Sequence, residues 1–399
     1  MSNNTVVIYG AGASYASGYK INLSSEGTRC SENPLMDKNF FSNKNILKLI
    51  ETKYYALRKF IEFYYGGMDN IKSLGLEELW TAVDLNHKHI KLGTYMWDKE
   101  TKKYQEDYFH SGGNRYPYQD VFSHSTYSYS SGRRAQIDSP IYNKCKFLGD
   151  CLRDLKGLIN DSLSDFGMGG SENYYQELHA LLNYKKNRLL GYITFNYDIL
   201  LEESLHVMNI PFRYVGMNEN IYDYTFLEGN LPIIKLHGSL NWEYVSSDIP
   251  VQQNKKIETV VPKHMNMDGS VSESAIIPPT LLKQEINDES RARDKDTLTQ
   301  IILQQWRAAI RLIWEADSLV IIGYSFPTTD FHAKRIFQIA TMWRRLNNKS
   351  KTKVLYCGGD KSDDAKNKLE GIFGQENEII IKNKFEKLCG SEEIKQFLA

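Results

Sequence analysis

The sequence predicts an α/β fold in which a parallel sheet carries helices on both faces. Short apolar runs recur along the chain, helical stripes separate several of them, and four of the runs end in segments rich in glycine and polar residues. Apolar runs without alternation are typical of strands buried on both sides. Strands that alternate with helices indicate βαβ units, which build parallel sheets.

The first predicted strand is the apolar run Thr5-Val6-Val7-Ile8, and the glycine turn behind it is expected to start a helix near Ser14. Later strands are expected over residues 189–195, 231–236, 318–322, 353–357 and 378–381. Apolar stripes at helical spacing predict one helix that follows the strand 189–195 and extends to residue 207, and further helices over 301–314 and 331–346.

Residues 46–185 interrupt this alternation and are expected to form a large, mainly helical insertion. Stripes predict helices over 46–65, 74–92 and 142–163. Residues 95–139 are rich in Tyr, Ser, Gly and Arg and follow neither period, so a long surface loop is expected there. The sheet domain would then comprise residues 1–45 and 186–399.

Composition limits the classes of function. The 399 residues include 49 basic and 49 acidic ones, so no overall field attracts nucleic acid, and a nucleic-acid partner is not indicated. No apolar run approaches the roughly 18 residues that span a bilayer, and no leader is expected before the first strand. The five cysteines are scattered without a Cys-x-x-Cys pair. We therefore expect a cytoplasmic protein without a membrane contact or a metal site.

Four segments that follow predicted strands carry residues that a packed core does not need. A glycine-rich turn lets backbone N–H groups approach a pyrophosphate, while asparagine and histidine at other strand ends suit a ribose. Together these features predict a site for a dinucleotide. The segments are Tyr9-Gly10-Ala11-Gly12-Ala13-Ser14, Thr194-Phe195-Asn196-Tyr197-Asp198, Lys235-Leu236-His237-Gly238-Ser239 and Gly323-Tyr324-Ser325-Phe326-Pro327.

These segments resemble the sirtuin signature, in which a Gly-Ala-Gly-x-Ser loop, a Thr-x-Asn-x-Asp segment and a Leu-His-Gly segment surround NAD. The chain is more similar to the prokaryotic sirtuin-like NAD hydrolases of antiphage defence, which carry Phe-Asn-Tyr-Asp and Gly-Tyr-Ser-Phe variants. The resemblance covers roughly the first 20 residues and, in patches, 189–360. It implies a Rossmann-like, sirtuin-type sheet that binds NAD.

The chain departs from the sirtuin deacylases at two places. Residues 243–299 contain no cysteine where those enzymes carry a zinc ribbon, so a hairpin and loops are expected instead. Gly18-Tyr19-Lys20-Ile21 stands where sirtuins have Ile-Pro-Asp-Phe-Arg. Both departures argue against protein deacylation.

The glycine loop has two interpretations. Gly10, Ala11, Gly12, Ala13 and Ser14 form either a phosphate cradle or a tight turn that packs closely. A dehydrogenase fingerprint is excluded by Tyr15 in place of its third glycine, and Glu26 and Glu32 have no predicted strand before them.

Asn196 either caps a helix that begins at Tyr197 or Asp198, or orients a ribose and a water molecule. Asp198 is either an acid in the first turn of that helix or a group on the carboxamide side of nicotinamide, with Thr194 and Phe195 beside it. His237 is either a structural residue or the base for a ribose hydroxyl or a water. The resemblance implies the second role for each.

The resemblance also places the segment 323–327 against the dinucleotide. Gly323 would allow a close approach, and Ser325 would donate to a phosphate or a ribose; otherwise both are turn residues. Asp360 follows another predicted strand and either accepts from the adenosine ribose or caps the next helix.

The resemblance implies hydrolysis of the nicotinamide–ribose bond of NAD+, which is a substrate and not a cofactor, in antiphage defence. It further implies a homo-oligomer and a separate partner such as a HerA-like ATPase. Two alternatives remain, a sirtuin-type deacylase and a regulatory module that binds NAD or ADP-ribose without turnover.

Overall fold

The structure is a computed structural model. It describes residues 3–25, 28–87, 140–163, 165–168, 172–183, 187–217, 231–247, 257–262, 274–277, 297–327, 330–358, 362–382, 384–389 and 391–397. The loop expected over 95–139 and the predicted site residue Asp360 lie outside these ranges.

A seven-stranded sheet forms the centre of the fold, with every neighbouring pair of strands parallel. Its order is β13-β12-β11-β1-β5-β7-β6, so β1 lies in the middle and the chain crosses to the other half after β7. This topology confirms the predicted Rossmann-like α/β class. The strands are β1 (Asn3–Tyr9), β5 (Asn187–Thr194), β6 (Phe212–Tyr214), β7 (Leu231–Lys235), β11 (Ser318–Ile322), β12 (Lys353–Cys357) and β13 (Glu378–Lys382).

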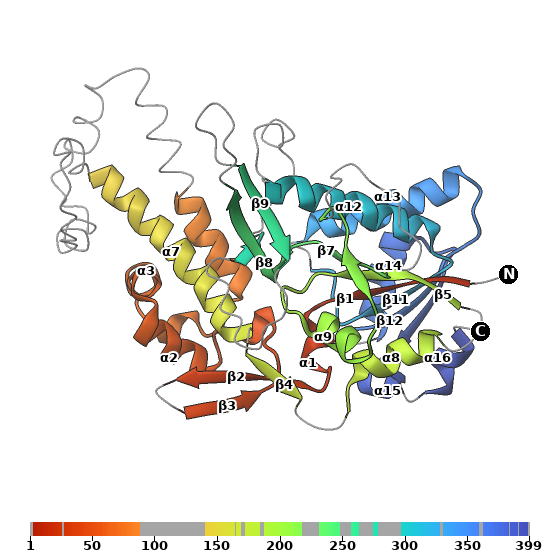
Figure 1. Ribbon diagram of the computed structural model, residues 1–399, viewed down its shortest axis with the longest axis horizontal. Helices are drawn as coiled ribbons and strands as arrows, with labels where there is room; N and C mark the ends of the chain where they lie inside the picture. The colour runs from red at the N-terminus through yellow and green to blue at the C-terminus, as the bar shows by residue number, and fades with distance from the viewer. Residues whose placement is uncertain are drawn as a thin grey trace, which may run out of the picture.

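Helices cover the sheet on both sides (Figure 1). α12 (Thr297–Glu315) and α13 (Phe331–Leu346) lie above it in this view, and α8 (Tyr174–Asn183), α15 (Phe385–Cys389) and α16 (Glu392–Phe397) lie below it. α14 (Ser362–Phe373) packs against α13 and β13. The short helices α1 (Ala11–Tyr15) and α9 (Leu200–Val207) follow β1 and β5.

A second hydrophobic core lies at the left of Figure 1, formed mostly by residues of the predicted insertion but also by Ile21, Leu240 and Ile276. α2 (Lys44–Lys53), α3 (Tyr55–Tyr65), a helical segment over residues 76–87 and α7 (Pro140–Leu163) surround it. The 3-10 turn η1 (Asp37–Asn39) precedes α2, and η2 (Met68–Ile71) lies between α3 and the helical segment 76–87. Helices were therefore predicted correctly over 74–92, within the described residues, and over 142–163.

The single helix predicted over 46–65 is wrong, because the chain breaks at Tyr54, which has φ −106° and ψ 75°. α7 contacts the chain on both sides of the break. Its Asp161 carboxylate accepts from the Tyr54 hydroxyl at 2.5 Å, and its Asp154 carboxylate accepts from the Leu57 amide at 3.0 Å. Both helices pack on one core, so the apolar stripe continues across the break.

Two small antiparallel sheets complete the fold. β2 (Tyr19–Ser25) pairs with β3 (Thr28–Glu32) and β4 (Phe166–Met168), so the expectation that no strand precedes Glu26 and Glu32 was wrong. These strands are outside the parallel sheet and do not restore a dehydrogenase fingerprint. β8 (Gly238–Ser247), β9 (Ile257–Pro262) and β10 (Ser274–Ile276) form the second sheet, which contains the hairpin expected within 243–299.

The helices of the described ranges include none that is long and apolar enough to cross a membrane.

Candidate functional site

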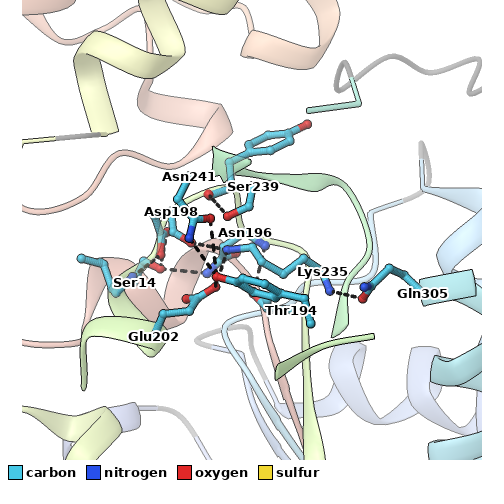
Figure 2. Close-up of polar contacts among 12 residues, drawn as sticks. Ser14, Thr194, Asn196, Asp198, Glu202, Lys235, Ser239, Asn241 and Gln305 are labelled. Carbon is cyan, nitrogen blue, oxygen red and sulfur yellow. Dashed lines mark hydrogen bonds and ion pairs between the residues drawn. The ribbon is translucent and has the colours of Figure 1, made fainter. Parts of the chain in front are cut away.

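Three neighbouring strands of the parallel sheet end at the same edge. Ser14 follows β1, Asn196 and Asp198 follow β5, and His237 follows β7. The carboxyl ends of parallel strands are where α/β folds collect their ligand-binding residues. The fold therefore places these predicted side chains at one edge, and Figure 2 shows Ser14, Asn196 and Asp198 close together there.

Ser14 lies at the centre of a buried hydrogen-bond network. Its hydroxyl donates to Asp198 Oδ2 at 2.7 Å and accepts from Asn196 Nδ2 at 2.8 Å. The Tyr175 hydroxyl of α8 lies 3.2 Å from Ser14 Oγ. Because the serine proton is already donated to Asp198, Tyr175 must be the donor in this third contact. All three bonds of Ser14 are thus made within the protein.

Asn196 uses both of its amide protons on the loop after β1. Nδ2 donates to the Gly10 carbonyl at 3.0 Å as well as to Ser14 Oγ. Its Oδ1 accepts no hydrogen bond from the described residues, so this oxygen can receive a hydroxyl or a water from a ligand. The helix-cap interpretation of Asn196 is wrong, since α9 begins at Leu200 with Ile199 at its N-cap and no side-chain cap.

Both oxygens of the Asp198 carboxylate have partners in the protein. Oδ1 accepts from the Leu200 amide at 3.2 Å, and Oδ2 accepts from Ser14. Burial raises the pKa of Asp198, and the nearby Lys235 ammonium opposes that rise. Asp198 lies before α9 and not in its first turn, so it orders the start of the helix from outside. Its proposed contact with a carboxamide stays a prediction.

His237 is held at the end of β7 by its backbone. Its carbonyl accepts from the Ile277 amide at 2.8 Å, and Gly238 then turns with φ +82°. A Cβ on Gly238 would lie 2.4 Å from the Ala275 carbonyl oxygen, so only glycine fits this turn. His237 is 9% exposed, and its imidazole lies 5.6 Å from the Phe195 ring, measured between centroids.

The glycines of the first loop pack against the loop after β11. A Cβ on Gly10 would lie 2.6 Å from the Gly323 oxygen, and one on Gly12 would lie 2.9 Å from the Gly323 Cα. The amides of Gly10, Gly12 and Ala13 donate to the carbonyls of Ile322, Gly323 and Gly10. The close-packing interpretation of this loop therefore has direct geometric support. A phosphate cradle would need amides other than these three, such as that of Ala11.

An aromatic stack connects the ends of β5 and β11. Tyr324 lies parallel to Phe195 with centroids 3.9 Å apart, and its hydroxyl donates to Asp330 Oδ2 at 2.7 Å. Asp330 also caps α13. Ser325 is half-buried, and its carbonyl accepts from Lys368 Nζ at 2.7 Å. Thr194 Oγ1 accepts a hydrogen bond from the backbone N–H of Asn196 at 3.1 Å and so stabilises the turn after β5.

Sequence reasoning missed three residues of the network, Tyr175, Glu202 and Lys235. Lys235 Nζ lies 2.9 Å from Glu202 Oε1, with the two side chains 0% and 1% exposed. A signal for this pair existed, because a lysine inside the apolar run 231–236 must be paired if that strand is buried on both faces. Tyr175 gave no such signal in a helix rich in aromatic residues.

No protein-family model matches the chain, and no curated protein matches it. Among solved structures, a Sir2 in complex with the inhibitor EX-527, 2'-O-acetyl-ADP-ribose and a deacetylated p53 peptide is 14% identical over 57% of this chain and 73% of its own, with a TM-score of 0.26. A structure described as the structural basis for sirtuin substrate affinity is 13% identical over 57% and 72%, with a TM-score of 0.25. At these TM-scores, neither similarity decides the activity of this chain.

Proposed function

We propose that the protein hydrolyses the nicotinamide–ribose bond of NAD+, giving nicotinamide and ADP-ribose. The observation that carries this proposal is that Asn196 and His237 follow the carboxyl ends of two adjacent parallel strands, β5 and β7. Asn196 is fixed by two donated hydrogen bonds, while its Oδ1 is left to accept. A fixed acceptor and an imidazole that follow neighbouring strands suit a ribose and an attacking water.

In the proposed reaction, the bond between ribose C1′ and the pyridinium nitrogen breaks, and its electron pair neutralises the nicotinamide ring. Positive charge develops on the ribose, and a water oxygen then bonds to C1′. His237 polarises a ribose hydroxyl or takes the proton of that water, and Asn196 Oδ1 orients the water or a ribose hydroxyl. Gly323, Ser325 and Asp360 are proposed contacts to the rest of the dinucleotide.

The biological role proposed here is NAD+ depletion in antiphage defence. It is supported by the resemblance of the four strand-end segments to the sirtuin-like NAD hydrolases. A constantly active enzyme of this kind would drain its own cell, so control by homo-oligomerisation or by a HerA-like ATPase partner is proposed with it. Size measurement of the purified chain, alone and mixed with such an ATPase, tests this part separately.

The proposed activity is tested by incubating the purified chain with NAD+ and measuring nicotinamide and ADP-ribose. We expect His237→Ala and Asn196→Ala each to reduce the rate by about 10²-fold or more, because each removes a positioned group. His206→Ala is the matched control, since His206 is exposed on α9 away from the strand ends, and its rate should equal that of the wild type.

Three outcomes would contradict the proposal. Formation of acyl-ADP-ribose from an acylated peptide would indicate a deacylase. Tight NAD+ or ADP-ribose binding without turnover, with and without the ATPase, would indicate a regulatory module. Wild-type turnover by a folded His237→Ala variant would remove this histidine from the reaction.

A further inference from the structure

A buried ion pair lies directly behind the site residues. Lys235 on β7 and Glu202 on α9, both labelled in Figure 2, are joined at 2.9 Å, and both side chains are almost fully excluded from solvent. Such a pair is weak evidence for stability, because two apolar residues of the same size often stabilise a core as well. Glu202 Oε2 is buried and has no hydrogen-bond partner among the described residues, which adds a cost.

The ammonium of Lys235 reaches the site through the backbone. Besides Glu202, Nζ donates to the carbonyl of Asp198. That residue belongs to the irregular segment 195–199 between β5 and α9, which has no ladder of its own. Lys235 therefore fixes the segment that carries Asn196 and Asp198.

The positive charge of Lys235 also acts on the Asp198 carboxylate. That carboxylate accepts a hydrogen bond from Ser14, and Ser14 in turn accepts one from Asn196. The contacts thus form one chain from Glu202 through Lys235, Asp198 and Ser14 to Asn196. On its far side, Glu202 Oε1 accepts from the Tyr214 hydroxyl at 3.1 Å. The last member of the chain is the one whose Oδ1 is open to a ligand.

We propose that Lys235 and Glu202 are positioning residues for the cleavage reaction, which hold Asn196 in place by fixing the segment 195–199. This inference rests on the proposed function. Neither residue touches the substrate. Their effect passes through Asp198 and Ser14.

The groups that face Asp198 are Lys235 from β7, Glu202 from α9 and Tyr175 from α8, together with the Ser14 hydroxyl. Burial raises the pKa of Asp198, Lys235 lowers it, and Glu202 raises it. Removing the two partners of one ion pair must therefore move the Asp198 titration in opposite directions. Loss of a merely structural contact would not produce opposite signs.

The experiment follows the Asp198 titration in the full chain by NMR of carboxyl-labelled aspartate, assigned with Asp198→Asn. We expect Lys235→Met to move the midpoint upward and Glu202→Gln to move it downward. Lys235→Arg keeps the charge and should stay close to the wild type. Midpoints that do not move, or that move in the same direction, overturn the proposal. If Lys235→Met does not fold, the downward shift in Glu202→Gln decides.

A second measurement links this charge to the reaction. The acid limb of kcat/KM for NAD+ cleavage should follow the Asp198 midpoint in each variant, with kcat reduced about tenfold in Lys235→Met and KM nearly unchanged, since the pair does not contact the substrate. An acid limb of kcat/KM that does not shift with the Asp198 midpoint overturns the positioning role. Absence of cleavage by the wild type would refute the proposed function instead, while the NMR titration would still report on the charge coupling.

Discussion

The two sides of β1 are joined to their neighbours by different means. On the β5 side, the contact consists of polar side chains, with Ser14 bonded to Asn196 and Asp198. On the β11 side, backbone packs on backbone, with Gly12 against Gly323 and no room for a Cβ on either. One loop supplies both contacts, because its glycines face β11 and its serine faces β5.

This difference separates the residues of the loop after β1 that serve packing from the one that contacts the proposed site. Close packing alone accounts for the glycines, since the amides of Gly10 and Gly12 are already bonded to the β11 side. The serine is not needed for that packing, and its partners are residues of the proposed site. Enlarging Gly12 would therefore disturb the fold whether or not a phosphate binds there, so the β5 side offers the cleaner tests.

The largest effect is expected on the backbone side. In Gly323→Ala the new Cβ would lie 2.0 Å from the Ala13 nitrogen, in a left-handed conformation with φ +67°. We expect a loss of about 3 kcal/mol or more of unfolding free energy, measured by chemical denaturation. Gly371→Ala in α14 is the control, because nothing lies within 4 Å of its Cβ and alanine favours the helix by about 1 kcal/mol.

A Gly323→Ala protein as stable as the wild type would contradict the packing account of this contact. Phosphate binding would then be the better interpretation of Gly10 and Gly12.

A smaller loss is expected on the polar side. Ser14→Ala removes one donor and two accepted bonds, and it leaves Asp198 Oδ2 and the Tyr175 hydroxyl without this partner. We expect a loss of about 2 kcal/mol together with a fall in NAD+ cleavage, because Asn196 is no longer held. Ser162→Ala is the control, since Ser162 is equally buried but donates only to the Ile159 carbonyl within α7.

Equal losses of stability in the two serine variants would show that the Ser14 network contributes no more than an isolated bond. Unchanged cleavage by Ser14→Ala would separate the network from the reaction.

Local patterns allowed the strands of the parallel sheet except β6, and several of the helices, to be predicted from the sequence. The run 318–322 and the stripe 331–346 coincide with β11 and α13, because periodicity reports burial directly. The break at Tyr54 was not predictable, since Asp154 and Asp161 lie about a hundred residues away in the chain. The strand β2 was missed although Tyr19, Ile21 and Leu23 alternate with polar residues, which is the pattern of a half-buried strand. β3 has no such alternation in its sequence.

The candidate site was predictable at its strand ends but not in its supporting contacts. The donors and acceptors around Ser14 come from α8 and from the segment after β5, and no spacing within the sequence relates these elements. Asn196 is the clearest example. Its position after a strand suggested a cap, but tertiary contact with Gly10 and Ser14 decided its orientation.

The smallest effect is expected on β1 itself, at Tyr9. Its hydroxyl is buried and has no hydrogen-bond partner among the described residues, while its ring packs on Tyr175 with centroids 4.8 Å apart. Tyr9→Phe keeps the ring and removes an unsatisfied group, so unfolding free energy should be unchanged or rise by up to about 1 kcal/mol. Tyr175→Phe is its counterpart, because it loses the bond to Ser14 and should cost about 1 kcal/mol. Chemical denaturation of both variants measures the difference in unfolding free energy. A loss in Tyr9→Phe as large as that in Tyr175→Phe would mean that the Tyr9 hydroxyl makes a hydrogen bond in solution. Polar contacts would then extend into β1 itself and not only to its β5 side.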